Sequence, residues 1–306
     1  MTGVNNPQLS AALSSVKSLA PLIAEERERL DANRELSPRL IDALVEANLF
    51  RLWAPTEFGG VELDPLSGLR VIAALSELDG SVGWNAMISS SYSFFAGRLP
   101  APVAKMIYGE RRAAVAGQLR PGGKAEIIDG GYQVSGRWAF GSGSKQGTWF
   151  LAQCVLHESG KPRPGAARLP EMRLVFVPAE RCRIHDTWHV SGLRGTGSHD
   201  YSIEDVKVPA EYSFDLLADQ PTRAEPLYSY PVMGMLLPTV ASVPVGIARS
   251  ALKAFKAIAK TKKSFPSGQT LSEHPTVQAQ FARAELFARS AETLLFDAVA
   301  DLWQTV

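Results

Sequence analysis

The segment DTWHVSGLRGTGSHDYSIEDVKVP, residues 186–209, places three glycines, two histidines and a tryptophan directly before an alternating apolar pattern. The alternation in its second half predicts a half-buried β-strand. A dinucleotide-binding fingerprint has a strand before its glycines and a helix after them, whose N-terminus holds the pyrophosphate. Here a strand follows the glycines, so the segment does not predict a Rossmann site. It predicts a loop whose glycines serve a different turn at a corner of a β domain.

The central part of the chain, residues 113–225, contains more short segments of this kind. They are rich in β-branched and aromatic residues and are separated by Gly, Pro and Asp clusters: AAVAGQL, GYQVSGRWAF, TWFLAQCVL and MRLVFVP. We expect an antiparallel β domain here. The stretch GSGSKQG, residues 141–147, lacks the Gly-Lys-Ser/Thr ending of a phosphate-binding loop and leads into a strand.

Residues 1–112 are predicted to form a helical domain. Residues 37–38 and 64–65 each pair an N-cap residue with a proline at the first helical position. The helix that begins there at residue 65 breaks at residues 79–80 and is followed by SVGWNAMISSSYSFFAGRL. This stretch is so apolar that we expect it to be buried on most sides.

The few polar atoms of that buried helix are expected to face something specific. Trp84 and Tyr92 are eight residues apart, a little over two turns, so they share one face. Ser89 and Ser93 are four residues apart on a neighbouring stripe and are expected to line the same cavity. Packing of the two aromatic rings in the core is the alternative.

Residues 226–306 are predicted to form a third, helical domain. Two strongly periodic helices, at residues 232–260 and 275–305, would each leave an apolar stripe uncovered. Partner helices from another subunit, or a C-terminal hairpin beyond this chain, would cover them. We therefore expect a homo-oligomer, a homotetramer or at least a dimer.

The composition favours a small-molecule partner. The chain has 306 residues, and its 32 basic and 31 acidic residues give a net charge of +1, which provides no field for attracting nucleic acid or anionic lipid. The N-terminus lacks a secretory pattern and no segment approaches 18 uncharged apolar residues, so we expect a soluble cytoplasmic protein with no membrane partner. Two cysteines, Cys154 and Cys182, are expected to be buried free thiols.

Three histidines near the opening segment raise the question of a metal site. His185, His189 and His199 lie in a predicted loop, and no cysteine or carboxylate completes a familiar ligand set around them. We expect them to have structural or hydrogen-bonding roles, and we predict no metal.

Four motifs in this order carry a family resemblance: RLWAPTEFGG (51–60), GSVGWNAMIS (80–89), GYQVSGRWAFGSGSKQGTWFLAQ (131–153) and GLRGTGSHDYSIEDVKVP (192–209). The chain resembles the acyl-CoA dehydrogenase superfamily over nearly its whole length. It is most similar to the branch of flavin-dependent monooxygenases that includes two-component aromatic hydroxylases and dibenzothiophene monooxygenases. The resemblance implies an α+β fold with an N-terminal helical domain, a central antiparallel β domain and a C-terminal helical bundle. That bundle is expected to be incomplete, since such proteins continue through two more helices that supply the catalytic base.

The resemblance implies the oxygenase component of a two-component flavin-dependent monooxygenase. Such a protein takes reduced FMN or FAD from a separate flavin reductase and uses O2, through a C4a-(hydro)peroxide, to hydroxylate an aromatic or other electron-rich small molecule. An acyl-CoA dehydrogenase with bound FAD is the alternative. A non-catalytic truncated paralogue that serves as an assembly partner is a third possibility.

The resemblance also implies individual roles around the flavin. Ser142 stands where this branch has a serine that contacts flavin N5, with Gly143 beside it, and its alternative is a turn hydroxyl. Gly117 and Gln118 lie on the strand that meets the pyrimidine edge of the flavin in such proteins.

The opening segment is then a wall of the flavin pocket. Its glycines let the backbone approach the isoalloxazine, while Trp188, Thr196 and Ser198 supply stacking and hydroxyl donors. The alternative is a corner of the β domain that only packs.

Two more regions complete the implied site. Trp84 and Tyr92 are expected to cover the substrate side of the flavin as catalytic residues, with the Tyr92 phenol a poor base at neutral pH. Lys263 and Phe265 resemble a segment that reaches the flavin phosphate of a neighbouring subunit, where lysine acts as a point charge. A solvated charge run is the alternative for this segment.

Overall fold

The computed structural model describes residues 6–165 and 169–306. Helices begin at Pro38 and Pro65, as the sequence predicts, because side-chain caps satisfy their first amides. Ser37 accepts a hydrogen bond from the amide of Leu40, and Asp64 accepts one from Ser67. The N-terminal helices are α1 (Pro7–Asn33), α2 (Pro38–Glu46), α3 (Pro65–Leu78), α4 (Gly80–Ser93) and α5 (Ala101–Tyr108).

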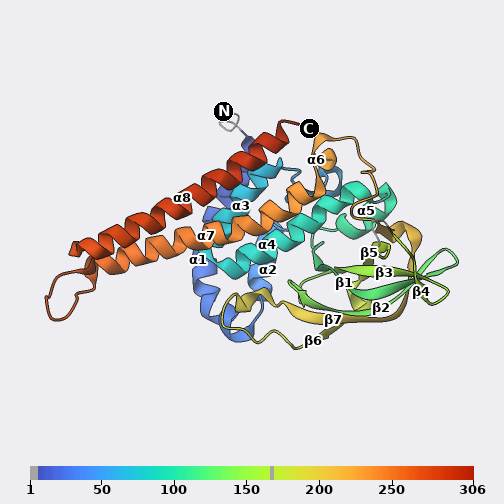
Figure 1. Ribbon diagram of the computed structural model, residues 1–306, viewed down its shortest axis with the longest axis horizontal. Helices are drawn as coiled ribbons and strands as arrows, with labels where there is room; N and C mark the ends of the chain where they lie inside the picture. The colour runs from blue at the N-terminus through green and yellow to red at the C-terminus, as the bar shows by residue number, and fades with distance from the viewer. Residues whose placement is uncertain (1–5, 166–168) are drawn as a thin grey trace.

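The break between α3 and α4 has a local cause. Asp79 ends α3 in an extended conformation, and its carboxylate accepts the amides of Ser81 and Val82 as the N-cap of α4. The new helix direction carries α4 between α7 and the sheet, with contacts to both (Figure 1). Nearly every residue of α4 is buried, as its sequence predicts.

The central strands form one curved eight-stranded sheet in the order β6-β7-β2-β1-β3-β5-β8, with β4 paired to β3. The expectation of an antiparallel domain was wrong for one pair: β1 and β3 run parallel, so the sheet is mixed. The strands are β1 (Val115–Ile128), β2 (Gly131–Gly141), β3 (Trp149–Glu158), β4 (Lys161–Pro162), β5 (Met172–Pro178), β6 (Arg183–His185), β7 (His199–Pro209) and β8 (Ser213–Phe214).

The parallel pair follows from the path of the chain. β2 turns back on β1 as a hairpin and pairs with β7 on its other side. The segment 142–148 then crosses β1 at its N-terminal end. β3 therefore starts beside the first residues of β1 and runs in the same direction. This crossing segment carries Ser142 past the first residues of β1.

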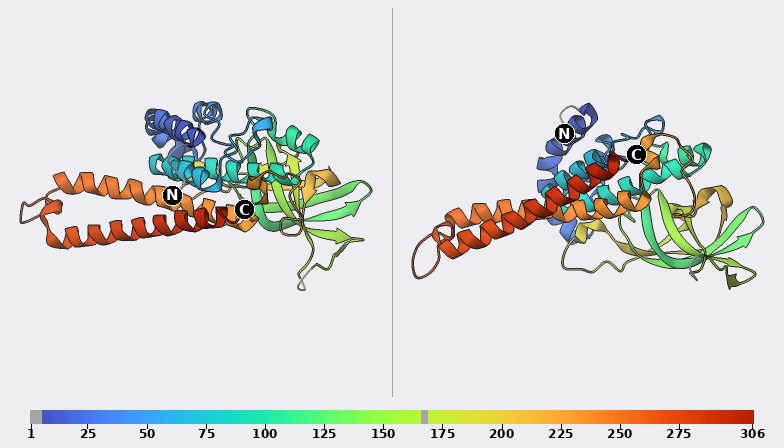
Figure 2. Two further views of the ribbon diagram at one scale, coloured as in Figure 1. Left: turned by 90° about the horizontal axis from the view of Figure 1, so that it is seen from above. Right: turned by 45° about the horizontal axis from the view of Figure 1, so that its top comes forward.

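The C-terminal helices are α6 (Pro226–Ser229), α7 (Val232–Thr261) and α8 (Pro275–Trp303). α7 and α8 lie side by side as a hairpin that projects far beyond the rest of the molecule (Figures 1 and 2). The first half of α7 packs closely on α3: a Cβ at Gly246 would lie 2.2 Å from the carbonyl oxygen of Ala73. The outer half is exposed.

α7 corrects the expectation that no segment approaches the length of a membrane span. It is long and apolar enough to cross a membrane by length and composition, with a mean hydropathy of 1.5 over its most apolar window. A core helix passes the same test, and the inward-facing residues of α7, among them Thr239, Ser242 and Val243, are buried against α3 and α4. Only 33% of that window is buried, so α7 packs against α3 and α4 along one face and leaves apolar side chains exposed on the other.

The two cysteines are free thiols, as predicted. Cys154 is buried in β3, whereas Cys182 is only half-buried. Desolvation is the largest effect on each thiol and raises the pKa of both to about 12.

Candidate functional site

A hydrogen-bonded chain of side chains, half-buried at Trp84 and buried at the others, connects α4 to two glycine-rich loops, residues 141–147 and 192–198. Trp84 Nε1 donates to Ser142 Oγ at 2.9 Å, Ser142 Oγ lies 2.7 Å from Ser198 Oγ, and Ser198 Oγ lies 2.7 Å from Thr196 Oγ1. Thr196 Oγ1 in turn donates to the carbonyl oxygen of Leu193 at 2.9 Å. Residues from three parts of the sequence therefore meet in one hydrogen-bonded series.

The direction of this series is determined by its two ends. The Leu193 carbonyl only accepts, so Thr196 uses its one hydroxyl proton there and must accept from Ser198. Ser198 then accepts from Ser142, and Ser142 accepts from the Trp84 indole, which only donates. Ser142 therefore has no proton left to donate and offers a free lone pair to any additional partner.

Sequence reasoning missed Asn85, which fastens both loops to α4. Its side chain is buried; Nδ2 donates to the carbonyl oxygens of Ser81 and Gly195, and Oδ1 accepts from Gln146 Nε2 at 2.7 Å. The backbone amide of Gly143 also donates to the Thr196 carbonyl at 3.0 Å. The available signal was the one amide side chain, next to Trp84, in a helix whose other polar residues all carry hydroxyl groups.

Tyr92 and Gly117 meet at the other end of this region. The Tyr92 hydroxyl donates to the Gly117 carbonyl oxygen at 3.3 Å, and Gly117 forms an antiparallel bridge with Ser142. Burial raises the pKa of the Tyr92 phenol far above its usual value, so the phenol stays protonated at neutral pH. Gly117 has a φ of +134°, and a Cβ there would lie 2.1 Å from the Leu151 carbonyl oxygen.

Aromatic side chains border the same loops. Phe140 is 52% exposed, has a φ of +63°, and packs edge to face with Trp188 at a centroid distance of 6.1 Å. An exposed aromatic residue with a left-handed backbone is uncommon, and strained positions of this kind cluster at functional sites. Phe140 was not predicted as a site residue, because the alternation of its strand gives no sign of its exposure.

Gln118 and Phe140 line a cleft of about 210 Å³ between β1 and β2. The Gln118 side chain is engaged with nearby backbone groups: Nε2 donates to the Ala139 carbonyl, and Oε1 accepts the amides of Leu119 and Arg120. A larger cavity of about 630 Å³ opens elsewhere, against Trp149 and Tyr212, and none of the predicted site residues lines it.

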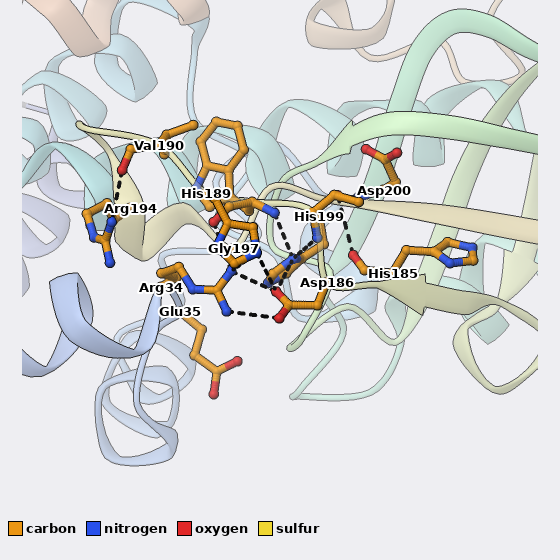
Figure 3. Close-up of polar contacts among 12 residues, drawn as sticks. Arg34, Glu35, His185, Asp186, His189, Val190, Arg194, Gly197, His199 and Asp200 are labelled. Atoms are coloured by element: carbon orange, nitrogen blue, oxygen red, sulfur yellow. Dashed lines mark hydrogen bonds and ion pairs between the residues drawn. The ribbon is translucent and has the colours of Figure 1, made fainter.

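A second cluster of polar residues holds the segment that begins at Asp186 (Figure 3). Arg34, at the C-terminal cap of α1, binds both carboxylate oxygens of Asp186, at 2.7 and 3.1 Å. The same guanidinium donates to the Trp188 carbonyl oxygen at 3.0 Å. Hydrogen bonding to Arg34 is the main reason that the pKa of Asp186 lies below its usual value.

Of the three histidines considered as metal ligands, His185 lies apart, while His189 and His199 both approach Asp186, at 3.8 and 3.5 Å. His185 Nε2 lies 2.9 Å from Ser202 Oγ, and His199 Nδ1 also faces two backbone amides. In the part of the chain that the structure describes, they do not form a cluster with other ligand types that could hold a metal ion. That the protein needs no metal stays a prediction.

Lys263 and Phe265 are not brought to this site within one chain. They lie in the turn between α7 and α8, at the far tip of the projecting hairpin, and Phe265 is 99% exposed (Figure 1). Ser89 and Ser93 are both buried, and Ser93 donates to the carbonyl oxygen of Ser90 within α4.

Comparison with known families agrees with the fold. The description "Acyl-CoA dehydrogenase, N-terminal domain" matches residues 14–96, and "Acyl-CoA dehydrogenase, C-terminal domain" matches residues 239–306. Among solved structures, XiaF from Streptomyces sp., in complex with FADH2 and glycerol, has a TM-score of 0.89 at 22% identity and covers 97% of this chain and 75% of XiaF.

Curated relatives indicate to which branch of this superfamily the chain belongs. Indole-3-acetate monooxygenase of Pseudomonas putida is 32% identical over 303 residues, which cover 97% of this chain and 76% of the relative. The oxygenase component of the FADH2-dependent resorcinol hydroxylase of Rhizobium sp. is 30% identical over 298 residues, covering 93% and 71%. The chain belongs to the acyl-CoA dehydrogenase superfamily. Within it, the chain belongs to the flavin-dependent monooxygenases, and its relatives include oxygenase components of such enzymes.

Proposed function

We propose that this chain binds reduced flavin delivered by a separate flavin reductase and uses O2 to hydroxylate an aromatic or other electron-rich small molecule. The observation that carries the proposal is the directed series from Trp84 through Ser142 to Thr196, placed beside exposed aromatic rings in a chain related to flavin-dependent monooxygenases. When bound, the reduced flavin supplies the activation of oxygen.

The residues present fit a reduced flavin. Reduced flavin carries an N–H at N5, and the free lone pair of Ser142 Oγ is an acceptor of the matching kind. Phe140 and Trp188 offer flat apolar surface for a heteroaromatic ring. The backbone at Gly117 and Gly143 allows close approach, because neither residue has a Cβ.

In this proposal, α4 shapes the substrate side. Trp84 and Tyr92 hold their polar atoms toward Ser142 and Gly117, so their rings fix the position of both loops relative to α4. The protonated Tyr92 phenol acts as a hydrogen-bond donor rather than as a base. Thr196 and Ser198 act through Ser142, since their own protons are donated within the series.

We also propose that the protein is a cytoplasmic homotetramer. Apolar side chains remain exposed along the α7–α8 hairpin; they are Leu237, Val240, Ile247, Phe255, Ile258, Leu286, Phe287 and Leu294. A neighbouring copy would cover them and would bring the tip of its hairpin, with Lys263 and Phe265, to the flavin phosphate of this chain. The position of these two residues at the far end of a projecting hairpin supports this arrangement.

Anaerobic titration with FMNH2 and FADH2, followed by rapid mixing with oxygen, tests the proposal. We expect tight binding of a reduced flavin, weak binding of its oxidised form, and a colourless protein on purification. Yellow protein that is bleached by acyl-CoA substrates would instead identify a dehydrogenase. A chain that binds neither flavin form would indicate a non-catalytic paralogue.

A further inference from the structure

His199 occupies an unusual position at the start of β7. Its side chain is buried, and its Nδ1 accepts the backbone amides of Thr187 and Trp188, each at 3.3 Å (Figure 3). Two N–H groups directed at one nitrogen require that nitrogen to carry a lone pair, which places the imidazole proton on Nε2. The neutral imidazole is the form that fits these contacts.

The backbone that His199 holds carries the Trp188 ring. Trp188 Nε1 donates to the Leu193 carbonyl oxygen at 3.2 Å, the same oxygen that accepts from Thr196 at the end of the hydroxyl series. The ring also packs against Phe140. The imidazole therefore supports residues 186–193 at the point where they join the proposed flavin site.

The charges around His199 come from three elements. Asp186 Oδ1 lies 3.5 Å from Nδ1, Arg34 and Glu35 face the ring from the end of α1, and Lys145 faces it from the segment after β2. Burial is the largest effect and lowers the pKa of His199; Lys145 and Arg34 lower it further, while Asp186 and Glu35 oppose them. The neutral form therefore dominates at and above neutral pH.

We propose that His199 is a positioning residue for the flavin site: its neutral imidazole holds the Thr187–Trp188 backbone, and protonation of Nδ1 frees these two amides and weakens the binding of reduced flavin. Arg34 still holds Asp186 and the Trp188 carbonyl oxygen, so the change is confined to the part of the loop that carries the Trp188 ring. Protonation would put an N–H on Nδ1, which could then donate to Asp186 Oδ1 at 3.5 Å but could no longer accept, so both amides would lose their acceptor. The link to flavin rests on the proposed function, but the hold on the loop does not.

Hydrogen exchange of the flavin-free protein tests the hold on the loop. His199→Asn keeps an acceptor near the position of Nδ1, whereas His199→Gln moves its amide to the position of Nε2. We expect the protection factors of amides 187 and 188 to fall about two- to tenfold in His199→Gln, the loss of one hydrogen bond, and to be largely kept in His199→Asn.

The pH dependence of amide protection distinguishes a hydrogen-bonding role of His199 from a role in packing alone. Wild-type protection at these two amides should decline as pH falls below about 6.5, because burial keeps the pKa of His199 below that ordinary histidine value. His199→Asn should remove this dependence, and His157→Gln, at a histidine remote from the loop, should retain it. Full protection in His199→Gln, or an unchanged pH dependence in His199→Asn, would overturn the proposal.

Anaerobic titration with FMNH2 and FADH2 over the same pH range tests the link to the ligand. We expect wild-type affinity to fall about two- to tenfold on acidification and His199→Asn affinity to stay level. If amide protection follows His199 while affinity does not, the loop is not a wall of the flavin site and the proposal fails at that step. If wild type binds no reduced flavin at any pH, the proposed function fails, and the exchange result still decides the role of His199.

Discussion

At the scale of single residues, Ser142 has hydrogen-bond partners for both its side chain and its backbone amide. It is the only member of the series that joins α4 to both glycine-rich loops, since it accepts from Trp84 and donates to Ser198. Its backbone amide is also engaged, with the carbonyl oxygen of Phe140 at 2.9 Å. A ligand that approaches Ser142 therefore meets an acceptor, and this favours a reduced flavin with its N5 proton over an oxidised one.

Ser142→Ala removes the acceptor of Trp84 and the donor to Ser198, so we expect it to lower the free energy of unfolding by about 1–3 kcal/mol, whereas the single contact to flavin N5 contributes only about 0.5–1.5 kcal/mol. The same loss from the barrier to peroxide elimination should speed hydrogen peroxide release about two- to tenfold. The measurement is the rate of peroxide release after the protein with reduced flavin is mixed with oxygen.

Ser144→Ala is the matched control for this experiment. Ser144 is a buried serine of the same loop, but it donates to the Gly197 carbonyl oxygen and lies outside the directed series. Its peroxide release should match wild type. Equal rates in Ser142→Ala and wild type would mean that Ser142 is only a turn residue.

At the scale of elements, the parallel pairing of β1 and β3 determines where the crossing segment runs. Gly117 is the residue of β1 that both pairs with β3 and forms the bridge to Ser142. Its φ of +134° and its distance to the Leu151 carbonyl leave no room for a side chain. The pairing of β1 with β3 and the position of Ser142 therefore both depend on Gly117.

Gly117→Ala should lower the free energy of unfolding by more than the roughly 1–3 kcal/mol of backbone strain alone, because the new Cβ also collides with β3. Gly130→Ala separates the two effects, since Gly130 has a φ of +76° and open space around it. Urea unfolding of both variants should show the larger loss for Gly117→Ala. Equal losses would mean that the β1–β3 contact relaxes without cost.

At the scale of the whole molecule, the projecting α7–α8 hairpin is the feature that a single chain leaves unexplained. Its outer half lies beyond the rest of the molecule (Figure 2). Large apolar side chains are exposed on both helices. An exposed apolar surface of this extent is typical of an interface between subunits. Assembly and completion of the flavin site are therefore expected to depend on the same hairpin.

The double variant Leu237→Lys and Leu294→Lys should dissociate the assembly, because it places two charges in the interface. Light scattering at micromolar concentration should show a smaller species than wild type. Leu217→Lys changes a leucine that is equally exposed but lies outside the hairpin, and it should keep the wild-type mass. A monomeric wild type would contradict the proposed tetramer.

Signals between near neighbours in the sequence were sufficient for much of the fold. The caps at Ser37, Asp64 and Asp79, the helical period of α7 and α8, and the turn before β7 all depend on contacts within a few residues. The motifs of the family resemblance then located the loops around Ser142 and Thr196. Both the order of helices, strands and helices and the convergence of these loops could therefore be predicted.

Only the tertiary structure decided how these parts act together. Trp84 and Ser142 are 58 residues apart in the chain, and Ser142 and Ser198 are 56 apart, so no local pattern encodes the direction of their hydrogen bonds. The parallel β1–β3 pair and the exposed Phe140 likewise depend on the path of the chain between strands. Alternation along a strand tells which side chains are buried, but not which strand is the neighbour or in which direction it runs.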